Sequence, residues 1–79
     1  MYFVYIVECC DASLYTGCTN NIEKRIKEHN EGKRGARYTS TRRPVVLKYT
    51  ETYKTIGEAL KREATIKTWP KKKKLLLFL

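Results

Sequence analysis

The hydrophobic and polar positions of this chain change their period from one segment to the next. Residues 2–9 (YFVYIVEC) are aromatic and β-branched, and residues 14–19 (LYTGCT) resume this composition after the polar turn CDAS. Such runs on either side of a turn predict an antiparallel hairpin. A third run at 45–53 (VVLKYTETY) predicts a third strand.

Between the second and third strands the spacing becomes helical. Asn20 is a good N-cap, Glu23 completes a capping-box pattern, and Gly32 supplies a helix end. One face of this helix carries three residues at i, i+4 and i+7, which are Ile22, Ile26 and His29.

A second capping-box pattern, Thr55 with Glu58, opens a helix over IGEALKREATIKTW. Its predicted apolar face consists of Ile56, Ala59, Leu60, Ala64 and Trp69. Pro70 then starts a short helical segment that holds four lysines and an apolar tail.

The resulting order is β-β-α-β-α-(α), over a single domain of residues 1–79. It predicts an α+β fold in which a three-stranded antiparallel sheet is flanked by helices. The first helix is joined to the third strand by a long basic loop (KRGARYTSTRRP), and long loops of this kind commonly carry binding residues.

Charge narrows the class of partner. Seventeen Lys and Arg residues against eight acids give a net charge of +9, which favours a polyanion, and nucleic acid before others. The alternative is a solvated basic surface. The expected nucleic-acid contacts lie in the basic loop and the lysine run: Lys33, Arg34, Arg37, Tyr38, Arg42, Arg43, Lys71 and Lys72.

Other classes are disfavoured. The three cysteines, Cys9, Cys10 and Cys18, match no disulfide framework, and together with His29 they match no zinc-finger spacing. They are typical of reduced cysteines in a cytoplasmic protein. The first ten residues lack a signal-peptide pattern, and the five apolar residues at the end are far fewer than the roughly 20 of a membrane span.

Three side chains are candidates for chemistry. Arg25 and His29 are one helical turn apart, and Glu63 lies beside the second apolar face, where a carboxylate needs a partner. Each also has a structural explanation: a surface arginine, a hydrogen-bonded histidine, or a salt-bridged glutamate. A lone hard oxygen ligand of this kind is what Mg²⁺ uses.

Taken together, these motifs resemble the GIY-YIG nuclease superfamily, and most closely its small stand-alone bacterial members (YhbQ-like proteins). FVY (3–5) stands where the family has Gly-Ile-Tyr, and YTG (15–17) stands where it has Tyr-Ile-Gly. RIKEHN carries the helix arginine and histidine, and ALKRE carries the metal-binding glutamate. The chain departs from the pattern at Phe3, which replaces a glycine, and it has no asparagine after Asn30.

The resemblance implies hydrolysis of phosphodiesters with one divalent ion, Mg²⁺ or Mn²⁺. By position, Tyr5 is the general base, Tyr15 hydrogen-bonds the phosphate or water, and Arg25 neutralises developing charge. His29 hydrogen-bonds a tyrosine hydroxyl and tunes it, and Glu63 holds the metal. A tyrosine has a pKa near 10, so nearby cations are expected to lower the pKa of Tyr5.

The implied activity is a DNA endonuclease acting on structured or single-stranded DNA in repair or recombination, with a protein partner for targeting. Two alternatives remain open: a nucleic-acid-binding module that has lost efficient cleavage, and an RNA-directed version of either. One geometric condition separates chemistry from plain strand formation. Tyr5 and Tyr15 must share a face of the hairpin, and the register decides this.

Overall fold

A computed structural model describes residues 1–31 and 37–78 of the chain. Three antiparallel strands form one sheet in the order β2-β1-β3. Their bounds are Tyr2–Glu8 for β1, Leu14–Thr19 for β2 and Val46–Tyr53 for β3. The helices of the described residues are α1 (Ile22–Glu31), α2 (Arg37–Ser40), α3 (Ile56–Lys67) and α4 (Lys71–Leu75). The predicted α+β class and three-stranded antiparallel sheet are confirmed.

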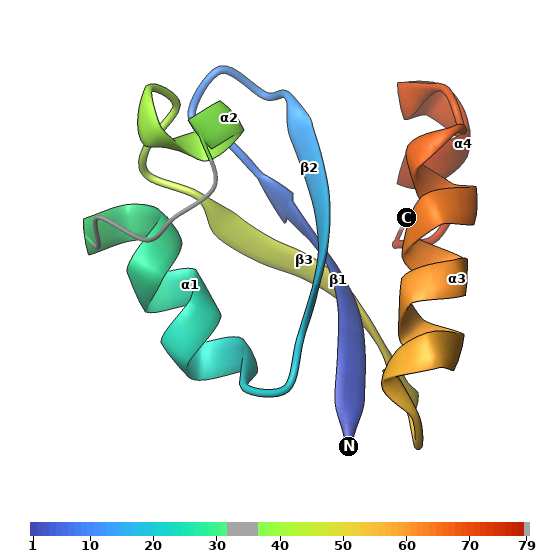
Figure 1. Cartoon of the computed structure of the whole chain (residues 1–79). Coiled ribbons are helices and arrows are strands. Elements are labelled where there is room, and N and C mark those ends of the chain that lie inside the picture. The colour runs from blue at the N-terminus through green and yellow to red at the C-terminus, as the bar shows by residue number, and fades with distance from the viewer. Residues whose placement is uncertain (32–36, 79) are drawn as a thin grey trace.

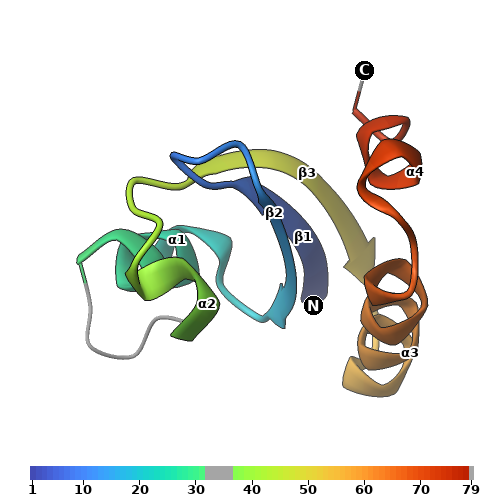
Figure 2. The same ribbon diagram turned by 90° about the horizontal axis from the view of Figure 1, so that it is seen from above.

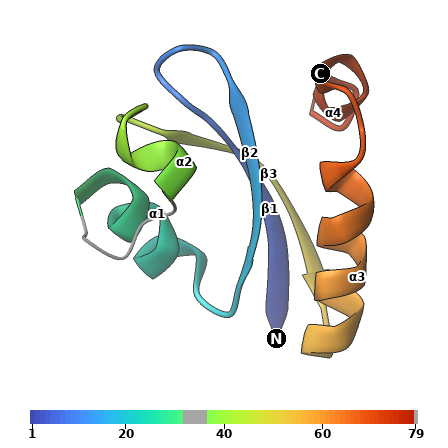
Figure 3. The same ribbon diagram turned by 45° about the horizontal axis from the view of Figure 1, so that its top comes forward.

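The sheet lies between two helical layers. Helices α1 and α2 cover one face, and α3 and α4 lie on the other (Figure 1). The view from above shows the twisted sheet separating the two pairs of helices (Figure 2). An intermediate view keeps α3 beside β1 and β2, opposite α1 and α2 (Figure 3). None of the helices in the described residues is long and apolar enough to cross a membrane.

The alternation of β1 divides the core between these layers. Its even positions Val4 and Ile6 are fully buried against Ala59 and Ile66 of α3. The odd positions pack into a second cluster on the α1 side, made of Tyr5, Val7, Cys9 and Val45 with Ile22 and Ile26 beside them. Because side chains of a strand point alternately to opposite faces, β1 supplies both halves of the core.

The sequence predicts the N-cap of α3 correctly, but not the N-cap of α1. Thr55 caps α3 as predicted, since its side chain accepts a hydrogen bond from the Glu58 backbone N–H. Helix α1, however, begins one residue later than the Asn20 prediction requires. The cap is Asn21, whose Oδ1 accepts from Lys24 N at 3.1 Å. Two adjacent asparagines offer equivalent side chains, and the exit of β2 selects the second. The predicted end at Gly32 lies outside the described residues.

The basic connection is more regular than a loop. Its second half contains the short helix α2, and Arg43 and Val45 then bind back to α1. The Asn30 side chain accepts from Val45 N at 2.6 Å and donates to Val45 O at 3.1 Å, in the manner of a neighbouring strand. This amide ties the start of β3 to the end of α1.

The predicted apolar face of α3 is correct at Ala59, which is buried, and at Trp69, which packs against the core, but wrong at Ile56, Leu60 and Ala64, which are exposed. Ile56 is 51% exposed and Leu60 49% exposed, whereas Ala59 and Ile66 are fully buried. Arg62 turns to the sheet and binds both oxygens of Glu51 on β3. The helix is rotated relative to the predicted face because Glu51 compensates the charge of Arg62, so a polar pair occupies part of the interface.

The C-terminal segment packs as the sequence indicates. Pro70 precedes α4, and Leu77 and Phe78 lie against the α3-side core, although Leu76 is exposed. Trp69 holds the junction of α3 and α4. Its ring lies under the Arg62 guanidinium at 5.0 Å and under the Lys73 ammonium at 4.3 Å.

Candidate active site

Tyr5 and Tyr15 lie on the same face of the hairpin. The register pairs Tyr5 with Gly17 and Val7 with Tyr15. Side chains of directly paired residues share a face, and so do residues two apart along a strand. Both tyrosines therefore face α1, which meets the geometric condition.

The glycine of the second motif makes room for the tyrosine of the first. The Tyr5 ring passes over Gly17, so a Cβ atom built at Gly17 would lie 2.3 Å from the Tyr5 hydroxyl oxygen. Any side chain at Gly17 would displace this hydroxyl. A glycine inside a strand is itself a sign of such a close approach, and it follows Tyr15 by two residues.

The His29 ring lies between the two tyrosines. Its centroid is 5.8 Å from that of Tyr5 and 5.3 Å from that of Tyr15, and both contacts are edge-on. The ring Nε2 lies 2.7 Å from the Tyr5 hydroxyl, and Nδ1 lies 2.7 Å from Thr39 Oγ1. His29 is fully buried. The expected contact between His29 and a tyrosine hydroxyl is present.

Arg25 reaches the same hydroxyl from the preceding turn of α1. Its Nε donates to the Tyr5 oxygen at 3.4 Å, and its Nη1 lies 3.4 Å from Glu28 Oε1. The i, i+4 spacing of Arg25 and His29 thus brings two different groups to one oxygen atom.

The environment of Tyr5 opposes its ionisation. Burial raises the pKa of Tyr5 to about 12, although Arg25 acts in the opposite direction. Arg25 thus lowers this pKa as expected, but desolvation outweighs the arginine and the net shift is upward. Burial and Arg25 also lower the pKa of His29 to about 4, so its imidazole is neutral near pH 7.

Glu63 approaches from the other layer. It lies on α3, and its charge is near enough to raise the pKa of Tyr5, after the larger effect of burial. The Glu63 carboxylate is 18% exposed and lies 2.9 Å from the Lys67 ammonium, one helical turn further on. Lys67 in turn lies 5.9 Å from the Tyr15 ring. Because β2 is an edge strand, its Tyr15 ring contacts residues from both helical layers. These residues are His29 of α1 and Lys67 of α3.

The residues present fit a single hard cation. The Glu63 carboxylate already binds one positive charge, the ammonium of Lys67. This ammonium lies beside the carboxylate, where a metal ion would bind. Among residues 1–31 and 37–78, no group of three or more His, Cys, Asp or Glu side chains gathers for a metal. One carboxylate with water and substrate oxygens is a ligand set that Mg²⁺ accepts.

The structure places part of the predicted nucleic-acid contacts. Lys33 and Arg34 lie outside the described residues, as do the side chains of Arg37 and Tyr38. Arg43 is half-buried and donates to the His29 carbonyl at 2.5 Å, so it holds the end of α1. Lys72 is exposed on α4.

Two basic segments meet at the β1–β2 turn. From one layer, Arg42 pairs with Asp11 at 3.1 Å. From the other, the Lys71 ammonium donates to the Ala12 carbonyl at 2.6 Å. The turn itself bends through Ala12, whose φ is 68°. The end of α2 and the start of α4, distant in sequence, thus flank one end of the sheet.

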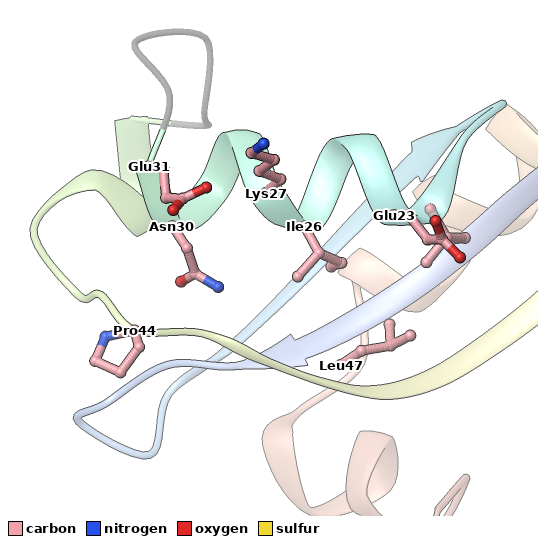
Figure 4. Close-up of a pocket in the computed structure, with 8 residues that line it drawn as sticks. Glu23, Ile26, Lys27, Asn30, Glu31, Pro44 and Leu47 are labelled. Atoms are coloured by element: carbon pink, nitrogen blue, oxygen red, sulfur yellow. The ribbon is translucent and has the colours of Figure 1, made fainter.

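A groove between α1 and β3 contains none of these groups. It has a volume of about 610 Å³ and runs between α1 and β3, with Ile26, Asn30 and Leu47 along it (Figure 4). It contains none of the five candidate catalytic residues.

Sequence reasoning missed three contributors to the site, namely Gly17, Thr39 and Lys67. The position of Gly17 inside a strand was a usable signal. Lys67 follows Glu63 at i+4, the spacing of a helical ion pair, and was also visible. Thr39 gave no signal, because its contact with His29 depends on how α2 folds back onto α1.

Comparisons with known proteins show the family of the chain. Residues 1–75 match the family model described as the GIY-YIG catalytic domain. The UPF0213 proteins of Staphylococcus aureus strains Mu3 and Mu50 are each 55% identical over 76 residues, covering 96% of this chain and 92% of theirs. The solution NMR structure of the UPF0213 protein BH0048 from Bacillus halodurans superposes with a TM-score of 0.60 at 42% identity, covering 98% of this chain and 82% of that one.

Proposed function

The chain belongs to the GIY-YIG family of catalytic domains, and on that premise we propose that it is a metal-dependent DNA endonuclease. The observation that carries the proposal is that Arg25 and His29 both contact the hydroxyl group of Tyr5. The Tyr15 ring lies beside His29. The charge of Glu63 reaches the same hydroxyl. Plain strand formation requires no such convergence.

In the proposed reaction a water attacks a phosphodiester of DNA. Tyr5 acts in its ionised form as the general base: its phenolate oxygen takes a proton from the attacking water and becomes the hydroxyl again. Arg25, which has a donor on the Tyr5 oxygen, opposes the negative charge that grows on the phosphate. Tyr15 orients the phosphate or the water from the edge strand.

Glu63 is the residue proposed to hold Mg²⁺ or Mn²⁺. Such an ion, when bound, polarises the phosphate and stabilises the leaving oxygen. Lys67 then has to leave the carboxylate, and its 48% exposed side chain has room to do so. The high pKa of Tyr5 also makes a cation valuable here, since positive charge favours the ionised tyrosine.

A second candidate function has its own observation. The ion pair of Glu63 with Lys67 satisfies the only carboxylate proposed for the metal. A protein that keeps this pair closed is a nucleic-acid-binding module without efficient cleavage, with DNA or RNA as its ligand.

The variant Glu63→Gln separates the two functions. For a nuclease, Mg²⁺-dependent cutting should fall by about 100-fold or more, with nucleic-acid binding retained. The substrates are linear, nicked, flapped and four-way DNA and a matched RNA, each assayed with Mg²⁺, Mn²⁺ or chelator. The matched control is Glu23→Gln, an exposed glutamate at the start of α1. Equal cutting by Glu63→Gln and wild type would place the metal elsewhere, and no cutting by wild type would favour the binding module.

A further inference from the structure

The Lys67 ammonium lies close to two groups of the candidate site. At the end of α3, its Nζ is 2.9 Å from Glu63 Oε2 and 5.9 Å from the centre of the Tyr15 ring on β2. The Lys67 side chain is 48% exposed, whereas that of Glu63 is 18% exposed. A lysine carries its charge on a flexible four-carbon stem, so the ammonium is the partner of this ion pair that can move.

A divalent ion and this ammonium compete for the same carboxylate. The ammonium holds Glu63 Oε2 at hydrogen-bond distance, and Mg²⁺ binds carboxylate oxygens more closely still, at about 2.0–2.1 Å. Two positive groups a few ångströms apart on one carboxylate repel each other. Metal binding therefore has to break the ion pair of Glu63 with Lys67, and the stability of that pair lowers the apparent affinity for the metal.

A phosphate at Tyr15 offers Lys67 a second anion. Tyr15 is the residue proposed to orient the phosphate, and Lys67 already lies within cation–π distance of its ring. A second ammonium is near, since burial, and after it the charge of Lys67, lowers the pKa of Lys74 on α4. A phosphate in this region relieves the repulsion between the two lysines, so its binding favours a Lys67 that is turned away from Glu63.

The exchange gives each charge a partner in both states. In the free protein, Lys67 neutralises Glu63. In the complex, the phosphate takes the ammonium, and the carboxylate, which is largely shielded from water, needs another cation. Each of the two ligands thus makes the site more favourable for the other.

We propose that Lys67 couples the binding of the divalent ion to the binding of a phosphodiester, because it pairs with Glu63 in the free protein and with the phosphate in the complex. This inference rests on the proposed function for the places of the ion and of the phosphate. The coupling is reciprocal, since linkage requires the nucleic acid to raise the affinity for the ion by the same factor by which the ion raises the affinity for the nucleic acid.

Mn²⁺ binding to the free protein tests the competition. Electron paramagnetic resonance measures the unbound ion during a titration of untagged protein without nucleic acid. Lys67→Gln should bind Mn²⁺ about 3- to 10-fold more tightly than the wild type, because the competing charge is gone. Lys67→Arg keeps the charge and should show no gain.

Lys61→Gln is the matched control for this titration. It removes the same charge from an exposed position of α3, two residues before Glu63, and residues two apart on a helix do not face each other. Its affinity for Mn²⁺ should equal that of the wild type. Circular dichroism establishes that each variant is folded.

A second titration contains a single-stranded oligothymidylate of about eight nucleotides. The Mn²⁺ that the oligonucleotide binds alone is measured separately and subtracted. The oligonucleotide should raise the Mn²⁺ affinity of the wild type. The factor should be about 3-fold smaller or less in Lys67→Gln, where no ammonium has to leave Glu63. Glu63→Gln should lose the site in both titrations.

The outcomes separate this proposal from the proposed function. Equal Mn²⁺ affinities of wild type and Lys67→Gln, with Glu63→Gln impaired, overturn the competition and leave Glu63 as the metal ligand. An equal effect of the oligonucleotide on wild type and Lys67→Gln overturns the coupling. If Glu63→Gln binds Mn²⁺ as the wild type does, the metal site of the proposed function fails, and this inference fails with it. If the expected affinities are found but the wild type cuts no nucleic acid, the endonuclease activity fails and the coupling stands.

Discussion

At the scale of single residues, the site depends on close contacts around the Tyr5 side chain, which leave no room for a larger neighbouring side chain. The Tyr5 ring occupies the space above Gly17, and its hydroxyl is shared by His29 and Arg25. These contacts come from a strand, a neighbouring strand and a helix. A shift of any one partner therefore changes the arrangement of the hydroxyl.

Gly17→Ala tests this packing. The added Cβ would lie 2.3 Å from the Tyr5 hydroxyl oxygen, so we expect a stability loss of about 1–3 kcal/mol and loss of most activity. Gly57→Ala is the control, because a Cβ at Gly57 on α3 meets nothing within 4 Å. It should stabilise the protein by about 0.5–1 kcal/mol. Thermal unfolding measures both, and a harmless Gly17→Ala would contradict the observed path of Tyr5.

His29 links the site to the pH dependence of stability. Its folded pKa of about 4 lies below the ordinary 6.5, so the unfolded chain binds more protons in the interval between them. Stability should be constant above about pH 6.5 on this account and fall by about 3 kcal/mol as the pH drops towards 4. Denaturant unfolding at pH 5 to 7 measures the slope. His29→Gln should remove it, and an unchanged slope in that variant would assign it to other groups.

At the scale of elements, α3 shows how a charged pair turns a helix. The sequence predicted a face of Ile56, Ala59, Leu60, Ala64 and Trp69. Ala59 of this set is fully buried, whereas Ile56 and Leu60 are about half exposed and Ile66, outside the set, is fully buried. The Arg62–Glu51 pair accounts for the difference, because Glu51 also accepts hydrogen bonds from Tyr49 and Tyr53 on its own strand. The same rotation directs Glu63 to the edge of β2.

The corrected face predicts which leucine-sized side chains of α3 stabilise the fold. Ile66→Ala should cost about 2–5 kcal/mol, because Ile66 is fully buried in the α3-side core. Leu60→Ala should cost less than about 1 kcal/mol, since Leu60 is 49% exposed. Chemical denaturation of the two variants gives the comparison. Equal costs would support the face that the sequence pattern predicted.

At the scale of the whole molecule, charge and catalytic groups are arranged around the sheet in different ways. The catalytic candidates meet at the β2 edge, and Arg42 and Lys71 meet at the β1–β2 turn from opposite layers. The basic end of the molecule, by which we mean the β1–β2 turn with Arg42 and Lys71, therefore adjoins the strand that carries Tyr15. This proximity is what a nuclease with a long polyanionic substrate requires.

Salt titration tests the basic end. If phosphates bind there, the logarithm of the affinity should fall linearly with the logarithm of the salt concentration, with a slope of about 0.9 for each neutralised phosphate of a duplex. Lys72→Gln should reduce the slope by about 1. Lys54→Gln is the control, because Lys54 follows Tyr53 at the opposite end of the sheet. A slope near zero would exclude phosphate contacts as the source of binding.

The sequence by itself determined the elements of this protein, since strand composition, helical spacing and the Thr55 cap are local properties. It also determined the family, because short motifs survive in order along the chain. It did not determine the Asn21 cap, helix α2, the buried face of α3 or the pKa of Tyr5. These depend on which groups lie close together after folding, and on the loss of water around them.

The site divides along the same line. Arg25 and His29 were predictable as a pair because one helical turn separates them. Their meeting with Tyr5, the approach of Glu63 around the β2 edge, and the contact between Thr39 and His29 were decided by the tertiary structure alone. The physical reason is that hydrogen bonds and charges act over a few ångströms in space, between residues that the chain separates by 10, 20 or more positions.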